Sequence, residues 1–154
     1  MQDNKLLQER IGIIFKDAGL LEVALTHRSF LNEHRKSKIV HNERMEFLGD
    51  AVLELVVTEF LYKNYKDPEG VLTNWRSALV KTESLAETAQ QLKLDEFIRL
   101  SRGEARNSAR ARSQIMANTV EAVIGAIYLD QGYGSAAEFI GKYINTKLAA
   151  IIKA

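Results

Sequence analysis

The sequence predicts an all-α helical bundle in a single domain. Apolar residues recur at helical spacing along most of the 154-residue chain, and no stretch shows the alternation of apolar and polar residues that marks a half-buried strand. Proline occurs once, at position 68, so little interrupts the helix-forming residues on either side of it. Hydrophobic residues make up 46% of the chain, which is the composition of a globular domain with a full core.

Two short helices are predicted near the N-terminus, before the strongest helix of the chain. Apolar residues outline the first helix over 6–15 and the second over 20–25. The polar, basic stretch 32–38 is expected to be a loop. The third helix is predicted over 42–65, with Asn42 as its N-cap and acidic residues near its positively charged end.

The middle of the chain is predicted to hold shorter elements. Residues 67–70, with the sequence Asp-Pro-Glu-Gly, are expected to form a turn. Thr73 and Ser84 are the predicted N-caps of the next two helices. A short element follows over 95–100, and the arginine-rich stretch 101–112 is expected to be a loop.

The C-terminal third is predicted to contain two helices. Ser113 is expected to begin a long apolar helix that runs to Leu129. Residues 131–134, which include two glycines, end that helix, and Ser135 is the predicted N-cap of a last helix that runs to residue 152.

Composition excludes several classes of protein. The chain has no cysteine, which rules out disulfide scaffolds, zinc–thiolate sites and thiol catalysis. The longest uncharged apolar runs, such as 122–129, are much shorter than the ~20 residues of a membrane span. Residues 1–5 lack the basic start and apolar core of a signal peptide. We therefore expect a soluble cytoplasmic protein without a membrane partner.

The charges are segregated although the chain as a whole is nearly neutral, at +1. Residues 43–69 contain seven acidic and three basic residues, whereas residues 99–112 contain five arginines and one glutamate. This segregation indicates one surface that binds cations and another that binds anions.

An acidic stripe runs along the third predicted helix. Glu46, Asp50, Glu54 and Thr58 follow one another at i, i+4 spacing, and Glu43 precedes them. Like charges at this spacing repel, and no lysine or arginine occurs between positions 44 and 63 to relieve them. The stripe is either a solvated helix face or half of a cation site.

A second carboxylate lies in the long apolar helix near the C-terminus. Glu121 is the only charged residue between 113 and 129, and Asn118 lies on the same helical face at i, i+3 spacing. A carboxylate in such a helix is costly to bury unless it is paired or bound to a metal. The alternative to a metal is an ion pair with an arginine, for which three are available: Arg28, Arg44 and Arg76.

Together the two helices offer oxygen ligands without imidazole or thiolate. Such a set suits Mg²⁺ or Mn²⁺, which can activate water and stabilise charge on a phosphate. The arginine-rich stretch is suited to phosphate contacts. The residues therefore point to hydrolysis of a phosphodiester, and their spacing alone specifies no more.

Residues 41–50, with the sequence His-Asn-Glu-Arg-Met-Glu-Phe-Leu-Gly-Asp, closely resemble the signature of the ribonuclease III family, in which leucine usually stands where this chain has Met45. Five further blocks occur in the order expected for that family, and the resemblance extends from about residue 6 to residue 143. These blocks are residues 25–29, 69–73, 76–80, 103–104 and 121–130.

The resemblance implies one all-α endonuclease domain over residues 1–154, without the C-terminal double-stranded-RNA-binding domain that family members commonly carry. It implies a Mg²⁺-dependent endoribonuclease, with Mn²⁺ as a substitute, that leaves 5′-phosphates and short 3′ overhangs on double-stranded RNA. It further implies a homodimer that processes precursors of ribosomal and messenger RNA.

The resemblance also assigns roles to residues. Glu46, Asp50 and Glu121 match catalytic metal ligands, Asn118 occupies the remaining ligand position, and Glu43 and Glu69 match accessory acidic positions in the same cleft. Phe47 matches an aromatic residue that contacts the partner subunit, with a place in the chain's own core as the alternative. The expected RNA contacts are Arg102, Arg106, Arg110 and Arg112, supported by Arg35, Lys36 and Lys38, unless the arginine-rich stretch is merely a solvated segment.

One departure from the family pattern bears on activity. The family usually has aspartate where this chain has Asn118, and an amide oxygen ligates a cation without contributing charge. We therefore expect weaker metal binding than with aspartate. The alternative function is a catalytically impaired dimer that binds double-stranded RNA. A protein that only dimerises would leave Glu121 and the arginines unexplained.

Overall fold

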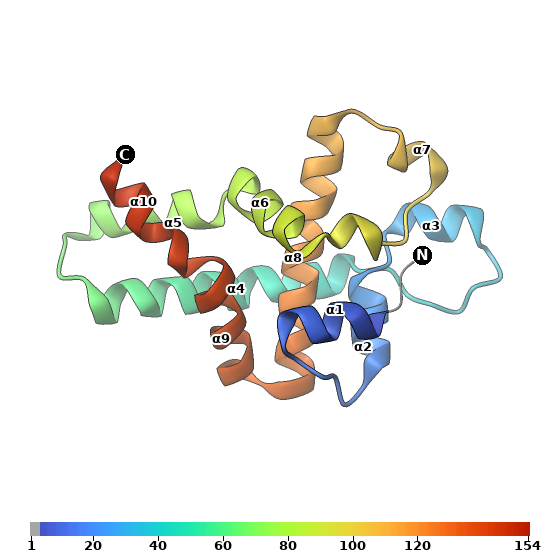
Figure 1. Cartoon of the computed structure of the whole chain (residues 1–154), viewed down its shortest axis with the longest axis horizontal. Helices are drawn as coiled ribbons and strands as arrows, with labels where there is room; N and C mark the ends of the chain where they lie inside the picture. The colour runs from blue at the N-terminus through green and yellow to red at the C-terminus, as the bar shows by residue number, and fades with distance from the viewer. Residues whose placement is uncertain (1–3) are drawn as a thin grey trace.

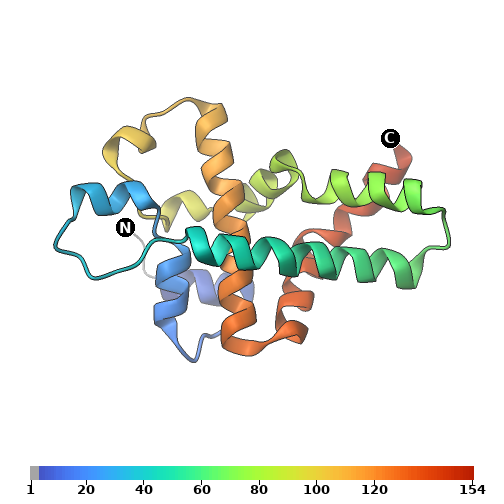
Figure 2. The same cartoon turned by 180° about the vertical axis from the view of Figure 1, so that it is seen from behind.

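Two long helices, α4 (Glu43–Asn64) and α8 (Ala109–Gln131), cross at the centre of the computed structural model, which describes residues 4–154 (Figure 1). The reverse view shows α5 (Glu69–Val80) returning beside α4 (Figure 2). Within residues 4–154 there is no β-strand, and only an isolated bridge joins Thr26 to Arg99. The all-α prediction is confirmed.

The N-terminal part forms three short helices rather than two. These are α1 (Asn4–Ile11), α2 (Ala18–Ala24) and α3 (Arg28–Glu33). The first ends earlier than predicted because Gly12 adopts a φ of +73°, a left-handed conformation that glycine tolerates. The α3 helix was not predicted, and its end falls within the stretch expected to be a loop.

The predicted helix over 42–65 is confirmed as α4, but Asn42 does not cap it through its side chain. The Asn42 side chain is buried, and its Nδ2 donates instead to the carbonyl of Ala24 at 3.0 Å. The backbone N–H of Asn42 donates to the carbonyl of Thr26. Asn42 therefore ties the start of α4 to the segment that follows α2.

The helices α5, α6 (Thr82–Leu92) and the short 3₁₀ helix η1 (Leu94–Glu96) occupy the middle of the chain. The predictions of Thr73 and Ser84 as N-caps are wrong, because α5 begins directly after Pro68 and both residues lie inside helices. Ser84 is buried, and its hydroxyl accepts a hydrogen bond from Nζ of Lys147 at 3.1 Å. A polar residue inside a helix can thus serve a tertiary contact instead of a cap.

The stretch 101–112 is not a loop. It contains α7 (Arg102–Ala105) and the first turn of α8, which begins before Ser113. Serine hydroxyls cap both helices: Ser101 accepts from the N–H of Glu104 at 3.1 Å, and Ser108 accepts from the N–H of Ala111 at 3.2 Å.

The last predicted helix is divided into α9 (Tyr133–Tyr143), η2 (Asn145–Lys147) and α10 (Leu148–Lys153). Gly132 separates α8 from α9 with a φ of +89°, and Ser135 lies inside α9 rather than at its cap. Within η2, Nζ of Lys147 donates to Thr88 Oγ1 of α6 at 2.9 Å, and α10 packs beside α5.

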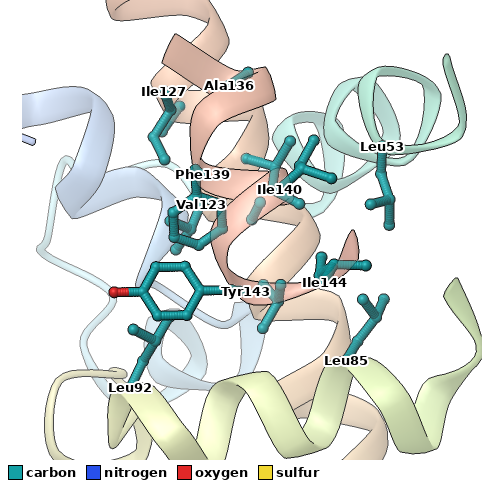
Figure 3. Close-up of a cluster of buried hydrophobic side chains, with 14 of the residues drawn as sticks. Leu53, Leu85, Leu92, Val123, Ile127, Ala136, Phe139, Ile140, Tyr143 and Ile144 are labelled. Atoms are coloured by element: carbon teal, nitrogen blue, oxygen red, sulfur yellow. The ribbon is translucent and has the colours of Figure 1, made fainter. Parts of the chain in front are cut away.

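A cluster of buried apolar side chains joins α9 to the two long helices and to α6 (Figure 3). One face of α9 contributes Phe139, Ile140 and Tyr143, and these side chains meet residues of three other helices. The labelled side chains of these three helices are Leu53 from α4, Leu85 and Leu92 from α6, and Val123 and Ile127 from α8. Burial of this cluster on four helices at once holds α4 and α8 in a fixed relation.

No helix among residues 4–154 combines the length and the apolar character that a bilayer crossing requires.

Candidate active site at the crossing of α4 and α8

Glycine lets the two long helices touch where they cross. A Cβ atom on Gly49 of α4 would overlap the backbone carbonyl of Glu121, and one on Gly125 of α8 would overlap the backbone carbonyl of Met45. No larger side chain fits at either position without moving a backbone. Because the backbones are in contact, the polar residues beside the glycines on the two helices are brought together.

The carboxylates at the crossing lie close enough to perturb one another. The pKa of Glu121 is raised to about 9, first by burial, then by a hydrogen bond with Asp50 and by the negative charges of Asp50, Glu46 and Glu54. Burial, together with Glu43 and Asp50, also raises the pKa of Glu46. The structure thus joins the acidic stripe of α4 to Glu121, as the charge pattern predicted.

These acids have no counter-charge from the described chain. Within residues 4–154, no lysine, arginine or histidine forms an ion pair with Glu46, Asp50 or Glu121. An arginine partner for Glu121 was the alternative to a bound metal, and no such pair forms. The partly buried Glu46 and Glu121 therefore lack the positive charge that would stabilise their ionised forms.

Two arginines instead relieve the ends of the acidic stripe. Arg28 lies 3.2 Å from Glu43, and Arg76 lies 3.3 Å from Glu54 and donates to Thr58 Oγ1 at 2.9 Å. The expectation of an unrelieved stripe is therefore wrong for Glu54 and Thr58, because Arg76 reaches them from α5. The unpaired carboxylates are confined to the crossing itself.

The donor chemistry at the crossing suits a hard divalent cation. Three carboxylates and an amide offer only oxygen ligands, which is the set that Mg²⁺ and Mn²⁺ prefer. In the observed side-chain positions of residues 4–154, no three Asp, Glu or His groups are close enough together to hold an ion. The residues fit such a cation by charge and ligand type, and the carboxylates would have to turn toward it.

Asn118 lies in this region with its oxygen already engaged. Gln114 Nε2 donates to Asn118 Oδ1 at 2.9 Å, and Thr82 donates to Gln114 Oε1 at 3.3 Å. The oxygen predicted to be a metal ligand thus accepts a hydrogen bond from a neighbour one turn earlier on α8. The sequence pattern did not single out Gln114.

The two accessory acids do not share a cleft within one chain. Glu43 begins α4, whereas Glu69 begins α5 beyond the opposite end of α4. The pairing of Arg76 with Glu54 shows which parts of α5 and α4 lie side by side. Glu69 lies two turns before Arg76 on α5, farther from the crossing. At ~1.5 Å per residue, Glu69 is therefore roughly 20 Å from Glu46 along the helix axis. The prediction of one cleft containing both acids is therefore corrected for the single chain.

A pocket of about 340 Å³ opens beside the carboxylates. It lies between the starts of α3 and α4 on one side and the α7–α8 segment on the other. Its lining includes His27, Glu43, Glu46, Glu104, Gln114 and Asn118. The pocket therefore lies between the proposed ligand positions on α4 and α8 and residues 101–112, which we call the arginine-bearing segment.

The four arginines predicted to contact RNA are exposed. Arg102 and Arg106 lie in and just after α7, and Arg110 and Arg112 lie near the start of α8. None of the four forms an ion pair in the described part of the chain. The N-terminal end of a helix carries partial positive charge, so Arg110 and Arg112 do not stabilise α8 by their position. Their position favours a role in binding an anion instead.

Phe47 points away from the core. Its side chain is 82% exposed, and two other large side chains of α4, Leu55 and Tyr62, are exposed as well. The alternative that Phe47 belongs to the chain's own core is wrong. The predicted contact with a second subunit remains a prediction.

Residues 17–148 match the Ribonuclease-III-like family. Ribonuclease 3 of Oceanobacillus iheyensis is 46% identical over 147 residues, which cover 95% of this chain and 64% of that protein. Ribonuclease 3 of Enterococcus faecalis is 47% identical over 152 residues, which cover 96% of this chain and 66% of that protein. The chain therefore spans slightly less than two thirds of the length of these relatives.

Solved structures give the same result. Two structures of the nuclease domain of ribonuclease III from Campylobacter jejuni superpose with TM-scores of 0.83 and 0.82, at 41% and 40% identity. They cover 94% and 96% of this chain, and the match spans 97% of each Campylobacter chain. The first of them describes structural flexibility in a region involved in dimer formation of that domain.

Proposed function

Because this chain belongs to the ribonuclease III family, we propose that it is an endoribonuclease that hydrolyses phosphodiester bonds in double-stranded RNA with the help of Mg²⁺. One observation supports this above all. Glu121 is held against Asp50 with a pKa raised to about 9, and no cationic side chain of residues 4–154 pairs with either. A site of this kind gains stability from a bound cation.

The proposed ligands are Glu46, Asp50, Asn118 and Glu121. These residues would hold a divalent cation, Mg²⁺ or Mn²⁺, which would supply positive charge for the scissile phosphate and would activate water. Glu46 and Asp50 approach from α4, and Asn118 and Glu121 approach from α8, so the glycine contact between the helices sets their separation. The carboxylates, once ionised, also accept protons from attacking water.

The arginine-bearing segment is proposed to bind the RNA backbone. Arg102, Arg106, Arg110 and Arg112 are exposed on the α7–α8 segment that borders the pocket, where phosphates of a duplex can reach them. The deep major groove of A-form RNA hides base edges from side chains, so recognition is expected to follow duplex shape. Precursors of ribosomal and messenger RNA in the cytoplasm are the proposed substrates.

The proposed active form is a homodimer. The region of the Campylobacter nuclease domain described as flexible is involved in dimer formation, and in this chain α4 exposes Phe47 in the position that the family uses for the partner contact. Glu69 lies far from Glu46 within one chain. If Glu69 acts at the metal site, it therefore acts at the site of the second chain of the dimer.

The alternative function is an RNA-binding dimer that cleaves poorly. It is favoured by Asn118, whose amide adds no charge to the site and whose oxygen accepts a hydrogen bond from Gln114 at 2.9 Å. The retention of three unpaired carboxylates at the crossing favours the enzyme.

Cleavage of a long labelled RNA duplex distinguishes the two functions. The wild-type protein with Mg²⁺ or Mn²⁺ at low salt is expected to make staggered double-strand cuts, and Glu121→Ala is expected to make none. Glu138→Ala, an exposed acid on α9, is the control and should cut like the wild type. Binding without cleavage by the wild type would favour the alternative, and Asn118→Asp would then be expected to restore cutting.

A further inference from the structure

His27 is held in a single tautomer by its surroundings. The backbone N–H of Ser29 donates to His27 Nδ1 at 3.1 Å, so Nδ1 is an acceptor. The Ser29 hydroxyl accepts the backbone N–H of Ser101 at 2.9 Å and lies 2.8 Å from the same Nδ1. A neutral ring with Nδ1 as acceptor carries its proton on Nε2.

The ring is also kept neutral. Burial lowers the pKa of His27, although Glu104 and Glu43 act in the opposite direction. Protonation of the ring would place a hydrogen on Nδ1, which already accepts from Ser29. The local hydrogen bonds and the burial thus favour the same form, a neutral imidazole with an Nε2–H donor.

His27 lines the pocket, and its Nε2–H group has no hydrogen-bond partner among residues 4–154. Among residues 4–154, the only fully buried polar side-chain atom without a partner belongs to Asn145, so the unpaired Nε2 of His27 is accessible to solvent. His27 lines the pocket beside the carboxylates together with Glu46 and Asn118. The ring therefore presents a fixed, neutral hydrogen-bond donor next to the proposed cleavage site.

We propose that His27 positions the substrate by donating Nε2–H to a backbone oxygen of the RNA, the 2′-hydroxyl of a nucleotide next to the scissile phosphate. This inference rests on the proposed action on double-stranded RNA. Phosphate oxygens share the same acceptor chemistry. The pocket is lined by Glu43, Glu46 and Glu104, and its one arginine, Arg28, is paired with Glu43 at 3.2 Å. The lining therefore keeps a net negative charge, which favours a neutral hydroxyl over a phosphate. A 2′-hydroxyl contact would also let the site distinguish RNA from DNA.

His27→Asn tests this contact without removing the helix cap. The asparagine oxygen can still accept the N–H of Ser29 at the start of α3, where asparagine is a favourable N-cap, but the variant lacks Nε2. His34→Asn is the matched control, because His34 is an exposed histidine after the other end of α3 and is not part of the pocket lining. Both variants are expected to melt at the wild-type temperature within a few degrees.

Affinity is measured by fluorescence anisotropy of a labelled RNA duplex in EDTA at low salt, so that no cleavage occurs. His27→Asn is expected to weaken RNA binding about three- to tenfold, the range for loss of one hydrogen bond, while DNA duplex binding stays unchanged. His34→Asn should bind both duplexes like the wild type. Unchanged RNA affinity of His27→Asn would overturn the proposal.

A scan of single 2′-deoxy substitutions along the RNA duplex locates the contact. The scan is made first with the wild-type protein and then with His27→Asn. One position is expected to lower wild-type affinity about three- to tenfold, and His27→Asn is expected to be insensitive to that same substitution. An equal loss by His27→Asn on RNA and DNA, without coupling to any 2′-hydroxyl, would assign the contact to phosphate and overturn the proposal. Failure of the wild type to bind any RNA duplex would instead contradict the proposed function.

Discussion

Glu121 combines burial with crowding by like charge, and both effects oppose its ionisation. Its pKa in the folded protein is about 9, against an ordinary value of 4.5. Between these two pH values the folded chain retains a proton that the unfolded chain loses. Proton linkage therefore predicts that the contribution of Glu121 to the free energy of unfolding is fully present below about pH 4.5 and is lost as the pH rises to about 9.

Glu121→Gln is expected to remove this pH dependence. In the absence of divalent cations at pH 8, the variant should be more stable than the wild type by about 1 kcal/mol, a value reduced for solvent screening at a partly exposed site. Thermal denaturation from pH 5 to pH 9 measures the effect. Glu69→Gln, an exposed acid away from the crossing, is the control and should follow the wild type. Parallel curves for wild type and Glu121→Gln would contradict this explanation.

Asn118 limits the charge that the site offers to a cation. Asn118→Asp adds a carboxylate beside Glu121, and Gln114 can still donate to it as it does to the amide oxygen. The affinity for Mn²⁺ is expected to rise about tenfold, since ligand charge tunes the binding of hard cations. Isothermal titration calorimetry measures this affinity. Asn107→Asp, in the lining of the same pocket, is the control, and equal gains in both variants would point to general electrostatics rather than ligation.

The helices α4 and α8 approach closely only because glycine occupies both sides of their contact. In a helix interior, alanine is normally favoured over glycine by about 1 kcal/mol. At Gly125 the added Cβ would meet the backbone of α4, so Gly125→Ala is expected to destabilise the protein by about 1–3 kcal/mol and to abolish cleavage. Chemical denaturation and the duplex-cleavage assay measure the two effects.

Gly141 of α9 supplies the matched control for this substitution. A Cβ atom there would have no neighbour within 4 Å, so Gly141→Ala should leave stability unchanged or raise it, in line with helix propensity. If Gly125→Ala behaved like Gly141→Ala, the glycine contact would not be what holds the two helices together.

Polar residues within helices explain most of the errors in the predicted boundaries. Serine and threonine are typical N-caps, but they also occur inside helices when another element binds their hydroxyls. Ser84 is such a case, because it accepts from Lys147, which is 63 residues away in the sequence. By contrast, α4 was predicted well because its apolar pattern is long and its end precedes the only proline.

The whole molecule exposes an apolar face on the same helix that carries the acidic site. Phe47 is 82% exposed, so Phe47→Asp is expected to leave folding and helical content intact. If α4 forms the proposed dimer contact, the variant should sediment as a monomer at concentrations where the wild type is a dimer. Ile14→Asp, at a 66% exposed position outside α4, is the control and should sediment like the wild type. A dimer that persists in Phe47→Asp would place the interface elsewhere.

The acidic and basic surfaces meet at the pocket beside the crossing. The segregation of charge along the chain predicts one surface for cations and another for anions. Glu43, Glu46 and Glu104 line the pocket that the α7–α8 segment borders. The distance between Glu69 and the crossing was not predictable, since it depends on the direction in which α5 returns along α4.

Properties that depend on near neighbours in the chain could be read from the residues alone. Helical periodicity, the i, i+4 acidic stripe and the isolated Glu121 are local patterns, and they led to the all-α fold and to the principal candidate ligands. The pairing of Arg76 with Glu54, the tautomer of His27 and the contact of Gly49 with the backbone of α8 join segments that are distant in sequence. Such contacts depend on how helices pack, so only the folded chain reveals them.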